Sequence, residues 1–362
     1  MLSVMDRYIF RSLLVNYLIA LGTMISLYVA LDLFVNMDEF TEKGYSAPTV
    51  LKHIMGYYWP NTFLYFAQLS GVITLFACLA TVARMRRNNE LTAVLASGVS
   101  LYRVARPILM FGIVTSGLMV VNTEWIVPSV AHLLARDHDD ADGLRAYEVL
   151  FLRDRNGALL SARQFRPGTQ DLHRLLVLTR NDDGVLIETL EADRASWNAL
   201  GYWQLERARR VTRLRRDDGP LAPRGVTETS YPTLYASDLS PQSIQLRQSE
   251  GWISFLGLSE LTKLAARGGP HAAAIAQTMH ARRTAPIVAV VLLLLGLPFF
   301  LDRSPANVLT DAGKCLIVCG LCYVSTIIVQ SLRSETISAL PAWIPIFVFG
   351  TLAVVLIDRV RT

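Results

Sequence analysis

Six stretches without Asp, Glu, Lys or Arg divide this 362-residue chain, and each is 17 to 31 residues long. A helix of roughly 20 apolar residues crosses a bilayer core of about 30 Å. Because lipid offers no hydrogen-bond partner, every backbone group in such a segment must be bonded within the protein, as it is in a helix. The sequence therefore predicts an α-helical membrane protein with six transmembrane helices. The stretches are Ser12–Leu31, His53–Ala83, Pro107–Thr123, Thr284–Leu301, Cys315–Leu332 and Thr336–Ile357.

Charged residues gather between the third and fourth stretches. The segment Arg136–Arg283 holds 21 of the 35 Lys and Arg and 19 of the 30 Asp and Glu, although only 18% of the whole chain is charged. Soluble domains carry roughly 25% charged residues throughout. This distribution excludes a single soluble globule, a disordered chain and a coiled coil. It predicts a polar domain inserted between two groups of three helices.

The insert reads as short alternating runs separated by turn signals such as Arg155-Asn156-Gly157 and Asp217-Asp218-Gly219-Pro220. Runs of this length and spacing favour an all-β sandwich or roll. The predicted strands are Glu148–Arg153, Leu159–Phe165, Leu175–Thr179, Val185–Leu190, Tyr202–Arg207 and Val211–Arg215.

Two connector helices are expected after the strands. Ser259 is a plausible N-cap for the first, Gly268-Gly269-Pro270 ends it, and the second leads into the fourth stretch. The predicted domains are 1–129, with the first three transmembrane helices and a short cytoplasmic helix near 86–98; 130–250, the β domain; 251–283, the connector helices; and 284–362, the last three transmembrane helices.

Arginine in the short loops predicts the orientation. Arg7 and Arg11 precede the first stretch, five arginines and one glutamate lie in Arg84–Arg106, and Arg359 and Arg361 follow the last stretch. Short loops rich in Lys and Arg remain in the cytoplasm. Both termini are therefore predicted to be cytoplasmic and the β domain to be outside, in the periplasm of a bacterium.

No catalytic constellation stands out. The string nearest to a phosphate-binding loop, Ala312-Gly313-Lys314-Cys315, lacks the first glycine and the final hydroxyl. The spacing of Cys315, Cys319 and Cys322 places them on one face of a helix, as small packing residues rather than as a metal site. Asp137-His138-Asp139-Asp140 is interpreted as an exposed acidic stretch. We expect no enzyme activity, cofactor or metal, and the small net charge of +5 gives no reason to expect nucleic acid.

A short helix is predicted between the second and third stretches. Glu90 opens it after the basic residues Arg86 and Arg87, its apolar residues Leu91, Val94 and Leu95 share one face, and Ser97-Gly98 closes it. Such a helix is either an interfacial turn or a segment that docks into the groove of a cytoplasmic partner.

Single charges at the edges of the membrane stretches have two interpretations as well. Asp32 follows the first stretch, and Glu124 interrupts the third before it continues to Val127. Each is either an interfacial cap or a group that faces a central cavity, because ionisable groups near a membrane avoid lipid.

Several motifs together carry a resemblance. They are Asp6-Arg7-Tyr8-Ile9, Glu90-Leu91 followed by Ala96-Ser97-Gly98, Arg282 and Pro286 at the start of the fourth stretch, and Gly296 and Pro298 near its end. With three helices, a β domain and three helices, nearly the whole chain resembles the lipopolysaccharide export permeases LptF and LptG (the YjgP/YjgQ type). The N-terminal motif and Leu33-Phe34-Val35 incline towards LptG.

The resemblance implies a non-enzymatic permease subunit of an ABC exporter in the bacterial inner membrane. Such a subunit extracts lipopolysaccharide and passes it through β-jellyroll domains to LptC-like and LptA-like jellyroll proteins. It pairs with a paralogous permease or with itself, and a cytoplasmic LptB-like ATPase dimer drives the pair. The ATPase-coupling residues would be Arg86, Arg87, Glu90, Leu91, Val94, Ala96, Ser97 and Gly98. The substrate-path candidates are Asp32, Lys43, Glu124 and Arg282.

One segment departs from the family pattern. Family members carry a lysine cluster after the first span, whereas here Asp32, Asp38, Glu39 and Glu42 accompany only Lys43 and Lys52. Either the paired subunit supplies the positive charge, or the substrate is a less phosphorylated glycolipid. One alternative is a permease for lipoprotein release or mechanotransmission, but such proteins usually have four spans. The other is a membrane-anchored sensor or scaffold, a function that does not explain the Glu90 helix.

Overall fold

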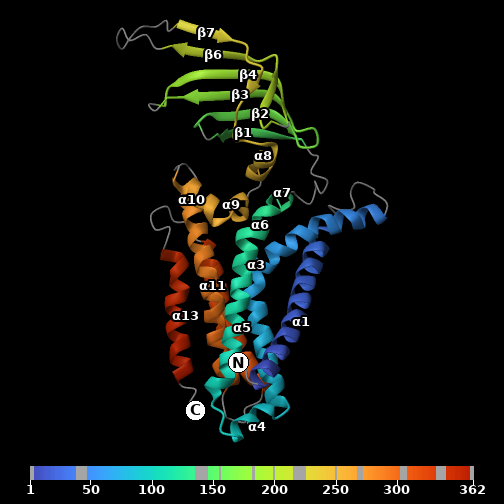
Figure 1. The fold of residues 1–362 in the computed structure, drawn as a ribbon, viewed down its shortest axis with the longest axis vertical. Coiled ribbons are helices and arrows are strands. Elements are labelled where there is room, and N and C mark those ends of the chain that lie inside the picture. Colours follow the sequence, from blue (N-terminus) through green and yellow to red (C-terminus); the bar gives the residue numbers. More distant parts are fainter. Residues whose placement is uncertain are drawn as a thin grey trace. The chain divides into compact units, whose positions relative to one another are not determined.

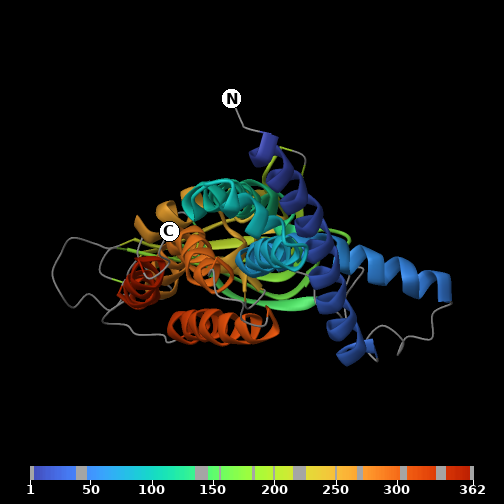
Figure 2. The same ribbon diagram turned by 90° about the horizontal axis from the view of Figure 1, so that it is seen from below.

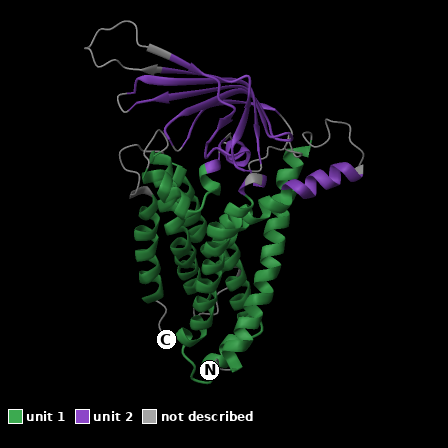
Figure 3. Ribbon diagram, turned by 45° about the horizontal axis from the view of Figure 1, so that its top comes forward, with its two compact units in different colours: residues 1–38, 58–130, 253–362 green, residues 39–57, 131–252 purple. Residues whose placement is uncertain are grey.

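The chain forms two compact units, coloured separately in Figure 3. One comprises Met1–Asp38, Tyr58–Val130 and Ile253–Thr362, and the other Glu39–Tyr57 and Ala131–Trp252. The computed structural model describes residues 4–37, 47–134, 146–154, 156–181, 184–198, 200–214, 226–248, 251–266, 272–301, 308–331 and 340–358.

Long helices make up the first unit. They are α1 (Val4–Val35), α3 (Ala47–Arg87, whose first residues group with the second unit), α5 (Leu101–Val121), α11 (Ala272–Phe300), α12 (Val308–Ser331) and α13 (Leu340–Asp358). Among the described residues, five helices are long and apolar enough to cross a membrane, and they coincide with the first five predicted stretches. At the sixth stretch, α13 contains a shorter apolar segment, Ala342–Asp358, while Thr336–Ala339 lie outside the described residues.

The helices extend beyond the apolar stretches that predicted them. Helix α1 begins at Val4 rather than Ser12, and α11 includes the second connector helix in one continuous run from Ala272. An uncharged stretch marks only the part that lipid can surround, whereas backbone hydrogen bonding continues into polar surroundings. The short helix α4 (Glu90–Ala96) lies at the end of the unit where α1 begins and α13 ends (Figure 1).

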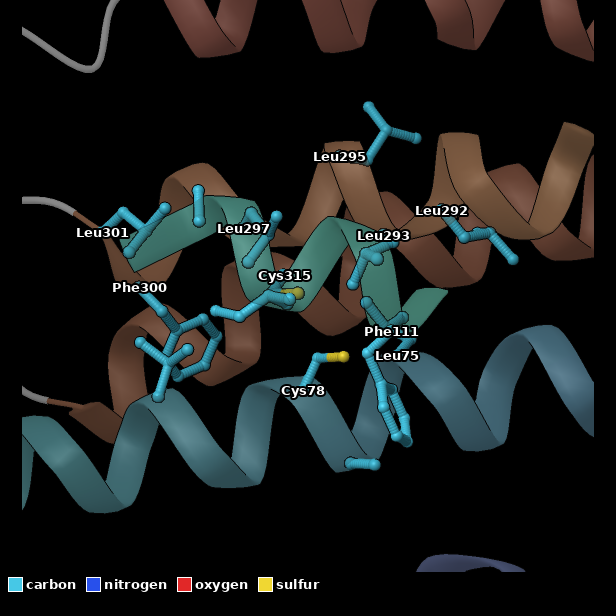
Figure 4. Close-up of a cluster of buried hydrophobic side chains, with 14 of the residues drawn as sticks. Leu75, Cys78, Phe111, Leu292, Leu293, Leu295, Leu297, Phe300, Leu301 and Cys315 are labelled. Atoms are coloured by element: carbon cyan, nitrogen blue, oxygen red, sulfur yellow. The ribbon is translucent and has the colours of Figure 1, made fainter. Parts of the chain in front are cut away.

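Helix α11 is the centre of this unit and packs against α5, α12 and α13, while α1 packs against α5. Seen along the helices, α1 and α13 lie on opposite sides of the unit with α11 between them (Figure 2). The packed interior contains Cys315 beside leucines of α11 (Figure 4), and Cys319 and Cys322 are also buried. The prediction that these three cysteines are packing residues is confirmed.

Glycines allow the helices to approach closely. A Cβ atom added to Gly71 of α3 would lie 3.2 Å from the Cβ and 3.3 Å from the Cα of Ala289 in α11. At Gly296 of α11, the added atom would lie 2.6 Å from Leu75 and 3.3 Å from the sulfur of Cys315. Small residues permit such contacts between membrane helices, where dispersion rather than water exclusion drives packing.

Within the described residues, the second unit contains an antiparallel sheet of eight strands, which confirms the predicted β domain. The strands are β1 (Tyr147–Arg153), β2 (Leu159–Arg166), β3 (Asp171–Arg180), β4 (Leu186–Trp197), β5 (Trp203–Glu206), β6 (Arg209–Leu214), β7 (Val226–Ser230) and β8 (Leu234–Tyr235). Consecutive strands pair from β1 to β5, and β4 also pairs with β6. One continuous curved sheet (Figure 1) is a roll rather than two stacked sheets.

The long strand β4 explains how the sheet curves. Its residues Glu188–Glu191 pair with β6, whereas Arg194–Trp197 pair with β5. Arg207, between β5 and β6, has a positive φ of 51°, so the chain bends where it moves from one half of β4 to the other. Trp203 is buried in the core of this unit, and its indole Nε1 donates to the carbonyl of Leu239 at 2.9 Å.

All six predicted strands are present, but β7 and β8 were not predicted. Their apolar alternation is weak: Val226–Ser230 contains one aliphatic residue, and Leu234–Tyr235 is only two residues long. Tertiary pairing with β6 and β5 supplies the order that these local sequences lack. Helix α8 (Pro241–Gln248) buries Ile244 in the same core.

The glycine contacts generate a stability prediction. Gly71→Leu forces a side chain against the backbone of α11 and should cost about 1–3 kcal/mol through overpacking. Gly117→Leu in α5 is the matched control, because an added Cβ there meets nothing within 4 Å. Thermal unfolding of the detergent-solubilised protein, followed by circular dichroism, should show a lower midpoint for the first variant only. Equal midpoints for the two variants would contradict the packing account.

Candidate functional site

Two residues with left-handed backbone conformations bound α4. Asn89, at the N-cap position, has φ 59°, and Gly98, just beyond the helix, has φ 83°. Asparagine and glycine tolerate this region better than other residues. The Gly98 backbone amide donates to the carbonyl of Leu95 at 3.0 Å, as is common where a residue with a positive φ ends an α-helix. The predicted start at Glu90 and the predicted end at Ser97-Gly98 are both confirmed.

The apolar face of α4 packs onto the helical unit itself. Leu91 is buried in the core that also contains Ile9 and Leu101, and Val94 and Leu95 pack against this core. This leaves Thr92, Ala93, Ala96, Ser97 and Gly98 exposed. A partner that binds α4 therefore meets small and polar residues, not the leucine face.

Both carboxylate oxygens of Glu90 have hydrogen-bond partners. The hydroxyl of Tyr8 in α1 donates to Oε2 at 2.8 Å, and the amide of Asn88 donates to Oε1 at 3.2 Å. Glu90 is half-buried. Its carboxylate is thus held in one orientation by residues before α4 and by the first membrane helix.

Arg86 forms an ion pair that the sequence did not predict. Its Nη1 lies 2.9 Å from Oδ2 of Asp311 in the first turn of α12, and only about a tenth of each side chain is exposed, 10% and 9%. Arg87, the next residue, is exposed. Of the two arginines predicted for coupling, Arg86 therefore joins α3 to α12, whereas Arg87 is exposed. The signal for Asp311 was available, because it is an isolated acid four residues before the fifth apolar stretch.

Asp32 lies one turn before the end of α1, against α3. The hydroxyl of Tyr58 donates to its Oδ2 at 2.8 Å, and the side-chain amide of Asn36 donates to its backbone carbonyl at 2.9 Å. One helical turn earlier, the rings of Tyr28 and Tyr65 lie 4.3 Å apart. Asp32 thus belongs to a polar contact between the first two long helices.

Two other substrate-path candidates, Glu124 and Arg282, form an ion pair with each other. Arg282 Nη1 lies 3.4 Å from Glu124 Oε1, and the exposed fractions of the two side chains are 8% and 21%. Arg282 Nη2 also donates to the carbonyl of Ser254 at 2.5 Å. The pair joins the segment that follows α5, helix α11 and the short helix α9 (Trp252–Phe255), which precedes α10 (Leu258–Ala266). Lys43 lies outside the described residues.

Glu124 occupies a π-helical turn, η1 (Asn122–Ile126), which sequence reasoning missed. Pro128 follows in α6 (Val127–Ser129) and has no amide hydrogen to donate to the Glu124 carbonyl, which was the available signal. Gly257 lies against this carbonyl, since an added Cβ would be 3.4 Å from it. Single π turns are frequent at functional sites.

The predicted N-cap Ser259 is wrong. Helix α10 starts at Leu258, so Ser259 lies inside its first turn, and the Leu258 amide donates to Glu124 Oε2 at 2.7 Å. A carboxylate from another segment satisfies the helix N-terminus, which therefore needs no local hydroxyl. A residue 134 positions away in sequence gives no local pattern for this cap.

The candidate residues fall into separate groups within the helical unit. Arg86 and Glu90 lie near α4, and the Glu124–Arg282 pair lies near α6 and α10 at the opposite end of the long helices (Figure 1). In the part of the chain that the structure describes, no three His, Cys, Asp or Glu side chains gather as metal ligands. Asp137-His138-Asp139-Asp140 lies outside that part.

Comparison with known proteins identifies a family. The model of the family described as "Lipopolysaccharide export system permease LptF/LptG" matches residues 7–359, nearly the whole chain. A search of curated proteins finds no match. The match does not distinguish LptF from LptG.

The buried Arg86–Asp311 pair generates a prediction for double substitution. Arg86→Met leaves Asp311 as an uncompensated buried charge and should cost about 3 kcal/mol in unfolding free energy. Arg86→Met with Asp311→Leu should recover most of that loss, whereas the exposed control Arg87→Met should change little. Denaturant unfolding in detergent measures these three variants and Asp311→Leu alone. The ion pair has no such role if the losses from Arg86→Met and Asp311→Leu simply add in the double variant.

Proposed function

The chain belongs to the LptF/LptG family of lipopolysaccharide export permeases and is a transport subunit of the inner membrane; on that premise we propose that it extracts lipopolysaccharide as half of an ABC exporter. A separate cytoplasmic ATPase dimer, similar to LptB, supplies the energy. The observation that carries this proposal is α4, a short helix between two membrane helices that fixes the carboxylate of Glu90 and exposes a face of small residues.

The proposed orientation places α4 and both termini in the cytoplasm. The basic residues near α4 support it, since Arg84, Arg87 and Arg103 accompany a single acid in that loop. The β unit then lies in the periplasm. There its curved sheet, whose apolar core includes the buried Trp203, is the proposed route of the acyl chains towards LptC-like and LptA-like jellyroll proteins.

The coupling residues are proposed to be Glu90 and the exposed residues of α4. An ATPase groove that receives α4 would contact Thr92, Ala93 and Ala96, because Leu91 is already buried against the permease. Opening and closing of the groove would then move α4 and, through Leu91, the helices beneath it. Arg87 is exposed and available for the ATPase surface, whereas Arg86 acts within the chain.

A second permease is the proposed partner within the membrane. In the most hydrophobic window of α1, none of the residues is buried within this chain, whereas half are buried in α5 and in α11. Leu18, Ile19, Leu27 and Leu31 are all exposed on α1. The paired permease, a paralogue or a second copy, together with lipid and substrate, would cover this surface.

The substrate path is proposed to pass Asp32 and the Glu124–Arg282 pair. Arginine pairs readily with phosphate, so a lipopolysaccharide phosphate can compete with Glu124 for Arg282. Asp32 and the acidic residues that follow it repel phosphate. We therefore assign most of the positive rim to the paired subunit.

The coupling proposal predicts the effect of charge reversal at Glu90. Glu90→Lys should weaken association with the ATPase by about tenfold or more, because a hydrogen-bonded carboxylate contributes about 1.5–3 kcal/mol. Glu90→Ala should have a smaller effect of the same sign. Both variants should fold, since the side chain is only half-buried. Co-purification of the ATPase with the tagged permease measures the change.

Glu260→Lys is the matched control for that experiment. Glu260 is also a glutamate in the first turn of a short helix, but it is exposed and belongs to α10. Its reversal should leave ATPase binding unchanged. If Glu90→Lys retains the ATPase and transports as well as the control, Glu90 has no part in coupling.

A further inference from the structure

Tyr8 connects the coupling helix to the first membrane helix. Its hydroxyl donates to Glu90 Oε2 at 2.8 Å, across 82 residues of sequence. Tyr8 lies in the second turn of α1, and Glu90 is the first residue of α4. Since Asn88 already engages the other carboxylate oxygen, the hydroxyl of Tyr8 completes the orientation of the carboxylate.

The contact is separate from the packing that holds α4 in place. Burial of Leu91 against the core that contains Ile9 and Leu13 fixes the position of the helix. Tyr8, in contrast, is 46% exposed, so its ring contributes little to that core. Removal of the hydroxyl alone therefore changes the hydrogen bond and leaves the packing intact.

Helix α1 carries the contact far from α4. It is continuous from Val4 to Val35 and contains no proline, so it has no built-in kink. Asp32 lies 24 residues after Tyr8, which corresponds to about 36 Å along the axis. At that end a second tyrosine hydroxyl, from Tyr58, bonds the Asp32 carboxylate. One continuous helix thus connects the Glu90 contact to the substrate-path candidate Asp32.

We propose that Tyr8 is a positioning residue that orients Glu90 and links ATPase-driven movement of α4 to α1. The inference rests on the proposed coupling role of Glu90 and adds, to the packing of Leu91, a polar link between α4 and α1. Leu91 holds α4 on the bundle in every state, while the Tyr8–Glu90 bond sets the direction in which α1 follows.

The test uses the assembled exporter, with the ATPase and the partner permease, in proteoliposomes. Tyr8→Phe should leave the amount of bound ATPase within about twofold of that in the parent complex. The thermal midpoint should stay within about 2 °C, because packing is unchanged. Lipopolysaccharide released per ATP hydrolysed should fall by about tenfold or more, as expected for the loss of one hydrogen bond to a charged group. Tyr102→Phe, at an exposed tyrosine in the first turn of α5, is the control and should release the parental amount.

A double-substitution cycle with Glu90→Ala completes the test. Tyr8→Phe should have no further effect in a Glu90→Ala background, since the two side chains act through one bond and alanine offers no acceptor. A parental ratio for Tyr8→Phe, or a loss that adds to that of Glu90→Ala, overturns the role of Tyr8 while the coupling role of Glu90 stands. A parental ratio for Glu90→Ala overturns both.

Discussion

A charge that is buried at the end of a membrane helix must find a partner within the protein, and this constraint organises the helical unit. Lipid cannot solvate an ionised side chain, and the cost falls only when a neighbouring group bonds it. The structure meets this requirement at both ends of the long helices. Arg86 pairs with Asp311 near α4, and Glu124 pairs with Arg282 near α6 and α10. Each pair joins helices that are far apart in sequence.

The same contacts hold the residues that we propose for coupling and for the substrate path. Glu90 is oriented by Tyr8 and Asn88, so α4 presents a fixed carboxylate beside an exposed face of small residues. Asp32 is bonded by Tyr58 at the far end of the helix that carries Tyr8. Between these ends the interior is apolar and closely packed around α11, where Gly71 and Gly296 bring the helices together. A movement of α4 would therefore act on helices that are closely packed against one another.

The features that depend on residues close together in the chain were predicted from the sequence. Uncharged stretches located the membrane helices, and Glu90, Ser97 and Gly98 marked the ends of α4 because caps are local signals. Prediction failed where the partner is distant. Asp311 lies 225 residues after Arg86, and the carboxylate of Glu124 caps α10 in place of the expected Ser259. The short strands β7 and β8 likewise depend on tertiary pairing, whereas the π turn at Glu124 had a local signal in Pro128 that the prediction did not use.

The central claim is that this chain moves lipopolysaccharide when its partner hydrolyses ATP. A photo-crosslinking amino acid at position 32, in the assembled exporter in proteoliposomes, tests the claim most directly. The account predicts capture of lipopolysaccharide that rises with ATP and does not rise when a non-hydrolysable analogue replaces it. A crosslinker at Ile317, which is 69% exposed on α12, should capture lipid regardless of ATP. Capture at position 32 that ignores ATP, or that yields only lipoproteins, would contradict the account.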